Sequence, residues 1–145
     1  MEFSKNYNEL GKIIVKKLRD ENFEFYEKSR DYGKSMSQKE YSELPKNENL
    51  LPEFQKLQDE RFEFFNTLTE KQTETLNRII LNILDSTAFN FLREIEENLG
   101  VNESIGMTIN GKKMEDINSE FLSGTLFGEY FLWVEKNSKF GEYQQ

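Results

Sequence analysis

Residues 69–100 read "TEKQTETLNRIILNILDSTAFNFLREIEENLG" and form the longest helical pattern in the chain. Thr69, followed three residues later by Gln72, predicts a capping box, in which each side chain bonds a backbone N–H at the start of a helix. Gly100 is typical of the position just after a helix ends. Between these ends, a repeat of three or four residues predicts an amphipathic helix. The expected inward stripe is Leu76, Ile80, Ile83, Thr87, Phe91, Ile95 and Leu99.

The polar run Asp85-Ser86-Thr87 leaves two arrangements open for residues 70–99. Short polar side chains can hydrogen-bond to the backbone and bend a helix. The segment is therefore either one helix of about thirty residues or two helices joined at this run.

Helices are also predicted before this segment. Residues 7–26 have helical apolar spacing, and residues 29–38 are rich in turn-forming residues. Ser37 and Glu40 predict a second capping box, opening a short helix that ends before Pro45. The residues expected to face inward in the first helix include Tyr7, Leu10, Ile14, Leu18 and Phe25.

A further helix is predicted to start at Pro52, because the missing N–H of proline is tolerated in the first turn. This helix is expected to end near Asn66. The side chains expected to face inward are Phe54, Leu57, Phe62 and Phe65.

The dipeptide Asn110-Gly111 predicts a β-hairpin over residues 105–117, because both residues tolerate the positive φ of a type I′ turn. Its Met107, Ile109 and Met114 face is expected to lie on the helices. A last helix should follow, capped by Asn118 or Ser119. The expected fold is mainly α: a single domain over 1–145, a bundle of about four to six helices with one small two-stranded antiparallel hairpin.

Composition excludes several classes of site. The chain has no cysteine and no histidine, so it offers no disulfide, no thiolate nucleophile and no imidazole base or metal ligand. No apolar run reaches the roughly 18 residues of a membrane span, and the polar N-terminus does not resemble a signal peptide. We therefore expect a cytoplasmic protein with no membrane association, no cofactor and no metal.

The net charge of −8 lies mostly in the middle of the chain. Residues 37–106 hold 14 Asp/Glu against 7 Lys/Arg. This balance argues against direct binding to nucleic acid, since phosphate affinity comes from clustered Lys and Arg. It fits a basic protein partner, mimicry of a nucleic acid, or simply a solvated acidic helix face.

Aromatic residues are concentrated near the C-terminus. A helical wheel places Phe127 and Phe131 on one face and Tyr130 and Trp133 on another. The second face is either a second core face or an exposed surface for recognition or self-association, for which Tyr and Trp are well suited. A homodimer would cover such a surface. The candidate partner-binding residues are Tyr130, Trp133, Tyr143, Glu94 and Glu97.

Residues 85–98 and 122–143 resemble a pattern in small acidic cytoplasmic bacterial proteins of unassigned function, some of them immunity partners of toxins. The resemblance covers about 60 of the 145 residues and consists of apolar spacing around a few points. It carries no catalytic signature and implies a binding role. The residues around which this apolar spacing is arranged are Asp85, Phe91, Leu92, Gly124 and Glu129.

These observations favour a non-enzymatic protein-binding module of the immunity or inhibitor type that covers a basic partner. The alternative is a structural or adaptor protein of a bacterium or phage, including an anti-defence protein that mimics nucleic acid. A third alternative is an enzyme that uses carboxylates. We expect no catalytic residues, and we expect the partner to be a basic protein or a second copy of the chain.

Overall fold

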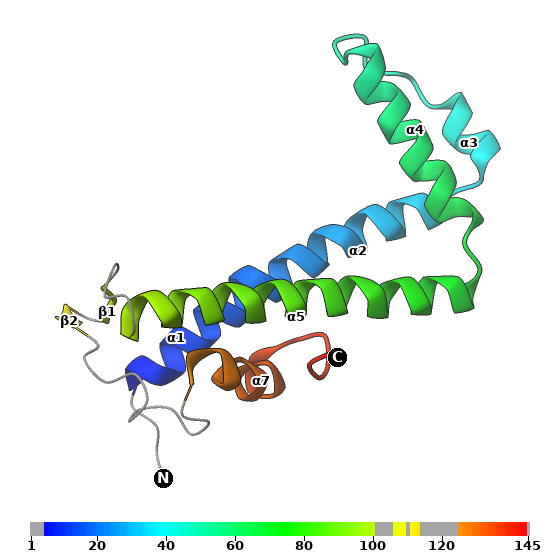
Figure 1. The fold of residues 1–145 in the computed structure, drawn as a ribbon. Helices are drawn as coiled ribbons and strands as arrows, with labels where there is room; N and C mark the ends of the chain where they lie inside the picture. Colours follow the sequence, from blue (N-terminus) through cyan, green and yellow to red (C-terminus); the bar gives the residue numbers. More distant parts are fainter. Residues whose placement is uncertain (1–4, 101–105, 110, 114–124, 145) are drawn as a thin grey trace. The chain divides into compact units, whose positions relative to one another are not determined.

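The computed structural model describes residues 5–100, 106–109, 111–113 and 125–144, and these are mainly helical, as predicted (Figure 1). Helical conformation continues from Lys5 to Lys34 through a five-residue π-helix, η1. The elements in chain order are α1 (Lys5–Val15), η1 (Lys16–Asp20), α2 (Glu21–Lys34), α3 (Gln38–Glu43), α4 (Pro52–Thr67), α5 (Glu70–Gly100), β1 (Thr108–Ile109), β2 (Lys112–Lys113) and α7 (Leu126–Asn137).

The chain divides into two compact units. Unit 1 comprises Met1–Asn22 and Arg78–Gln145, and unit 2 comprises Phe23–Asn77. Unit 1 joins two segments that are distant in sequence, whereas unit 2 is one continuous stretch. The single domain expected over 1–145 stays a prediction.

Unit 1 is built on the packing of α1 and α7 together with the part of α5 after Arg78 (Figure 1). Gly11 allows the closest approach, because the indole ring of Trp133 lies where a Cβ atom at position 11 would stand. Thr125 caps α7 by accepting a hydrogen bond from the backbone N–H of Gly128 at 3.1 Å. The core side chains are Tyr7, Val15, Ala88, Leu92, Leu126, Tyr130, Trp133 and Val134.

The long segment 70–100 forms one helix, α5, so the polar run at 85–87 does not divide it. Its predicted inward stripe is wrong in part, because Ile83, Thr87 and Phe91 are exposed. The physical reason is that a neighbouring stripe containing Asp85 faces the core, where this carboxylate has an ion-pair partner. The buried residues of that stripe are Leu81, Asp85, Ala88 and Leu92.

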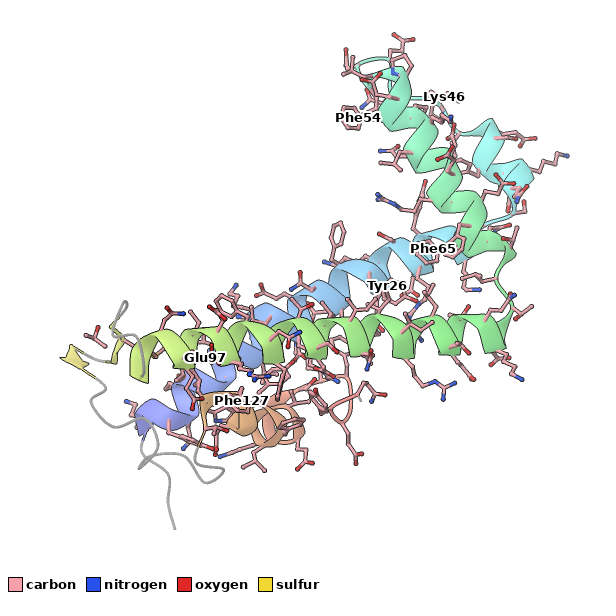
Figure 2. All side chains as sticks on the ribbon, viewed as in Figure 1. Tyr26, Lys46, Phe54, Phe65, Glu97 and Phe127 are labelled. Carbon is pink, nitrogen blue, oxygen red and sulfur yellow. The ribbon has the colours of Figure 1, made fainter. Side chains whose placement is uncertain are left out.

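Unit 2 packs α2 against α4 through aromatic rings. The centroids of the Tyr26 and Phe65 rings are 5.9 Å apart (Figure 2), and Phe23 lies 5.3 Å from Tyr26. Gly33 lets the two helices approach, since a Cβ there would lie 2.4 Å from that of Phe65. The buried apolar residues of unit 2 are Phe23, Phe62 and Phe65.

Local capping predictions are confirmed in this part of the chain. Ser37 and Glu40 form a reciprocal capping box at the start of α3, and Thr69 and Gln72 do the same at the start of α5. Pro52 occupies the first turn of α4, as expected. These motifs form because each bond joins residues only three positions apart.

Two predictions for unit 2 are wrong. Residues 29–34 continue α2 as helix instead of forming a turn. Phe25, Phe54 and Leu57 face outward, with about half or more of each side chain exposed. Apolar spacing predicts which residues share a helix face, but not whether another part of the chain packs on that face. Within unit 2, no other described helix covers the faces that carry Phe25, Phe54 and Leu57.

The hairpin prediction over 105–117 falls partly outside the described residues, and the predicted caps Asn118 and Ser119 lie entirely outside them. Thr108 lies opposite Lys113 and Ile109 opposite Lys112 in a two-residue antiparallel pairing. Met107 is partly buried against the core of unit 1. The wider hairpin stays a prediction.

Replacing Gly11 with Ala should destabilise the chain. The added Cβ would lie 2.3 Å from Cδ1 of Trp133, and the large indole cannot move without repacking the core. Overpacking of this kind costs about 1–3 kcal/mol, against which the better helix propensity of alanine returns roughly 1 kcal/mol. Chemical denaturation measures the difference. Gly106→Ala is the control, because nothing lies within 4 Å of its Cβ position; equal effects of the two changes would contradict the prediction.

Candidate functional site

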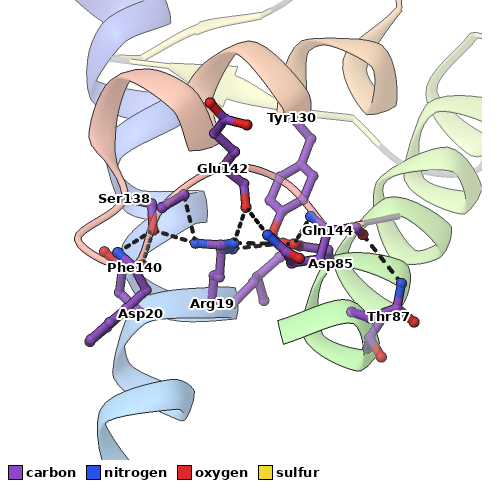
Figure 3. Close-up of polar contacts among 12 residues, drawn as sticks. Arg19, Asp20, Asp85, Thr87, Tyr130, Ser138, Phe140, Glu142 and Gln144 are labelled. Atoms are coloured by element: carbon purple, nitrogen blue, oxygen red, sulfur yellow. Dashed lines mark hydrogen bonds and ion pairs between the residues drawn. The ribbon is translucent and has the colours of Figure 1, made fainter. Parts of the chain in front are cut away.

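Two fully buried charged residues, Arg19 and Asp85, form an ion pair in unit 1. Nε of Arg19 donates to Oδ1 of Asp85 at 2.8 Å, and Nη2 donates to Oδ2 at 3.3 Å (Figure 3). Both side chains are completely buried. Asp85 also accepts from the Tyr130 hydroxyl at 2.7 Å and from the backbone N–H of Gln144 at 2.8 Å.

The same arginine holds the segment after α7. Its Nη2 donates to the Glu142 carbonyl at 2.7 Å, and its Nη1 donates to the Gly141 carbonyl at 3.3 Å and to the Ser138 hydroxyl. A guanidinium has five N–H donors, so these bonds and the two to Asp85 use all of them. We interpret this network as structural, because a saturated and buried cation has no donor left for a ligand.

Two further buried carboxylates have partners. Asp20 accepts from the Ser138 hydroxyl at 2.7 Å and from the Lys139 backbone N–H at 3.1 Å. Glu129 accepts from the Tyr7 hydroxyl. Burial and this carboxylate raise the pKa of Tyr7, so the tyrosine remains a proton donor.

The sequence-predicted partner residues do not form one site. Tyr130 and Trp133 are fully buried in the core of unit 1. Of the two alternatives for their helix face, the second core face is therefore the one observed, and the exposed recognition surface is wrong. Tyr143 is partly buried, and its ring lies 4.2 Å from that of Phe131. Glu94 and Glu97 are exposed on α5, and Figure 2 labels Glu97 on this helix.

The buried charges were missed by the sequence analysis, although their spacing carried a signal. Arg19 follows the core residue Val15 by four positions, and Asp85 lies between Leu81 and Ala88 at helical spacing. A charged residue on an apolar stripe is expected to have a buried partner of opposite charge. The resemblance had pointed to Asp85 and Glu129, but without assigning them a role.

A groove in unit 2 is lined by aromatic and charged side chains. It has a volume of about 440 Å³ and lies beside α3, the following loop and α4. Tyr41 stacks on Phe62 with ring centroids 3.9 Å apart, and Tyr32 meets both rings edge-on. We call Tyr32, Tyr41 and Phe62 the aromatic wall, and this opening the acidic groove. Its charged lining residues are Lys46, Asp59 and Glu63.

The carboxylate of Asp59 is held in one orientation. Its Oδ1 accepts from the Tyr41 hydroxyl at 2.9 Å and from Nε2 of Gln55 at 2.8 Å. The bonds from Gln55 and Tyr41 lower the pKa of Asp59, so it stays ionised at neutral pH. Burial, reinforced by the bond to Asp59, raises the pKa of Tyr41 to about 12. Among the described residues, Oδ2 faces only Nζ of Lys46, 4.0 Å away.

A second groove of about 430 Å³ lies on α2 and α4 and uses the same aromatic wall. Its lining side chains include Phe25, Lys28 and Arg61. We call it the basic groove. The two openings therefore have charged residues of opposite sign around shared aromatic rings.

No family model, curated protein or solved structure matches this chain. Among the described residues, no helix has the length and apolar content needed to cross a lipid bilayer. The same residues bring no group of three or more carboxylates together as metal ligands. The functional argument therefore depends on the grooves themselves.

Replacing Asp85 with Asn should strongly destabilise unit 1. The change leaves the buried guanidinium of Arg19 without a counter-charge, and breaking a buried ion pair costs about 3–5 kcal/mol. The free energy of unfolding from chemical denaturation measures this loss. Glu97→Gln, on the exposed face of the same helix, should change it by no more than about 0.5 kcal/mol. A similarly small effect of Asp85→Asn would refute the structural role of the pair.

The pKa of Asp59 should rise when Tyr41 is replaced by Phe, because one hydrogen bond to the carboxylate is lost. In the unchanged chain the carboxyl titrates below its usual value of 3.8. Its bonds therefore stabilise the fold above about pH 4 and are lost as the pH falls through the lowered pKa. NMR titration of the Asp59 side-chain carboxyl measures its pKa in the unchanged chain and in the Tyr41→Phe variant.

Tyr32→Phe is the control for this titration. Tyr32 lies in the same wall, while the hydroxyl bonded to Asp59 is that of Tyr41. The Asp59 pKa should be unchanged by Tyr32→Phe and should stay somewhat below 3.8 after Tyr41→Phe, because Gln55 still donates. An equal rise in both variants would show that the Tyr41 bond is not the cause.

Proposed function

We propose that this chain is a non-enzymatic protein-binding module that covers a basic partner, in the manner of an immunity or inhibitor protein. The observation that carries the proposal is the oriented carboxylate of Asp59 beside the aromatic wall of the acidic groove. An anionic acceptor next to aromatic faces suits the guanidinium or ammonium group of a partner side chain.

The orientation of Asp59 favours binding because little side-chain freedom remains to be lost. Tyr41 and Gln55 fix Oδ1, and Oδ2 is left for an incoming donor. The contact with Lys46 is long, and the lysine side chain is 68% exposed. An exposed pair of this kind contributes at most about 1 kcal/mol, so a well-placed partner cation can replace it.

Exposed apolar side chains of unit 2, of which Leu44 lines the groove, supply contact area. Phe54 and Leu57 lie on α4, and Leu44 and Leu51 lie in the segment between α3 and α4. All four are exposed to between 43% and 55%. Aromatic and aliphatic anchors surrounded by polar groups are typical of protein-binding surfaces, where a few residues carry most of the affinity.

Carboxylates around α3 and α4 would attract a basic partner over a longer range. They are exposed and belong to the acidic segment 37–106. Charge complementarity of this kind raises the association rate more than the final affinity, and the effect weakens with salt. The residues are Glu40, Glu43, Glu53, Glu60 and Glu63.

Affinity capture with the purified chain tests this proposal. We expect a basic protein from lysate of the source organism to be retained at low salt and released at high salt. Asp59→Asn should weaken its binding by about tenfold or more, because a hydrogen bond between charged groups contributes about 1.5–3 kcal/mol. Glu74→Gln is the matched control, since Glu74 is exposed on α5 and lines neither groove.

Two outcomes would contradict the proposal. A retained protein that binds the Asp59→Asn variant as tightly as the unchanged chain would place the binding site elsewhere. Retention of nothing except a second copy of the chain would replace the basic partner with self-association.

A further inference from the structure

The basic groove has features that the proposed function does not use. Phe25 stands at this opening with 69% of its surface exposed, and Tyr32 is 50% exposed. Lys28 reaches the groove from α2 and Arg61 from α4, while Ser29 and Gln58 add polar groups. Two cations thus lie around an aromatic surface within one opening of unit 2.

Neither cation has an ion pair among the described residues, although other basic residues of unit 2 do. Arg30, on the same helix as Lys28, bonds to Glu27 and Asp31. Lys56, on the same helix as Arg61, lies 3.7 Å from Glu60. In a chain with a net charge of −8, two unpaired cations at one opening give it a local charge opposite to that of the molecule.

We propose that the basic groove binds an acidic, apolar segment of a protein partner. A carboxylate of that segment lies between Lys28 and Arg61, and the adjoining apolar side chain packs on Phe25 and Tyr32. Charge complementarity selects this occupant, because the cations bind an anion and the aromatic rings bind the residue beside it. The inference goes beyond the proposed function, since it concerns another opening and the opposite charge.

A phosphate-bearing polymer fits this groove less well than a carboxylate. Affinity for nucleic acid grows with the number of neutralised phosphates, and this groove offers two cations within an acidic chain. Glu60 and Glu63 are exposed on the same helix as Arg61 and would repel neighbouring phosphates. A single side-chain carboxylate brings one negative charge instead of several, so the repulsion is smaller.

Blocked dipeptides test the proposal with one change of charge. The probes are N-acetyl-Phe-Glu-amide, N-acetyl-Phe-Gln-amide and N-acetyl-Phe-Lys-amide, titrated into the full ¹⁵N-labelled chain and followed by NMR. We expect the Glu probe to shift the signals of Phe25, Lys28 and Arg61 and to bind about fivefold more tightly there than the Gln probe. This ratio corresponds to about 1 kcal/mol, the upper end for an exposed charge pair.

Arg61→Gln and Lys28→Gln should each abolish this preference for the Glu probe over the Gln probe. Both side chains are exposed, so the variants should fold, and the melting temperature of each checks this. Lys39→Gln is the matched control, because Lys39 is exposed and lines neither groove. It should leave the preference unchanged.

Three results would overturn the inference. Equal binding of the Glu and Gln probes would show that the cations do not select an anion. Displacement of the Glu probe by equimolar inorganic phosphate would indicate a general anion site instead of a site for an acidic peptide. Shifts of the same groove signals on simple dilution of the chain would identify a second copy as the occupant.

The Lys probe separates this inference from the proposed function. It should bind in the acidic groove and lose affinity with Asp59→Asn, whereas the Glu probe should not respond to that change. Failure of the Lys probe alone would count against the proposed function, and failure of the Glu probe alone would count against the basic groove.

Discussion

The buried pair of Arg19 and Asp85 is the constraint on which the arrangement of unit 1 depends. A guanidinium removed from water is stable in a protein only when its donors are bonded and its charge is balanced. Satisfying it requires α5 to present Asp85 and the chain after α7 to present the carbonyls of Gly141 and Glu142. The position of residues 138–144 thus follows from the bonding needs of one side chain.

The sequence was most informative where an interaction joins close neighbours. The capping boxes at Ser37 and Thr69 could be predicted because their partners lie three residues away. The Arg19–Asp85 pair joins residues 66 positions apart, and apolar periodicity treats both as solvent-facing. For this reason the predicted stripe of α5 passed through Thr87 instead of Asp85.

The exposed alternative for Tyr130 and Trp133 is wrong for a related reason. The two aromatic faces of the last helix left open whether the second face is core or surface, and both residues are buried in unit 1. Phe25 on α2 and Phe54 and Leu57 on α4 are uncovered, although each had been expected to face inward. Periodicity defines a face, and only the tertiary structure decides whether the chain itself covers that face.

The two units use their charges in different ways. In unit 1, all five N–H donors of the Arg19 guanidinium bond to groups of the protein itself. These bonds fix the fold and leave no donor for a ligand. In unit 2, Oδ2 of Asp59 has a single ion-pair contact among the described residues, with Nζ of Lys46 at 4.0 Å, and Arg61 has no ion pair among them. Because the grooves that hold them share the aromatic wall and differ in sign, a partner inserted in the reverse orientation would set like charges against each other. Such repulsion makes an interface specific, since discrimination between partners depends on the difference between their binding free energies.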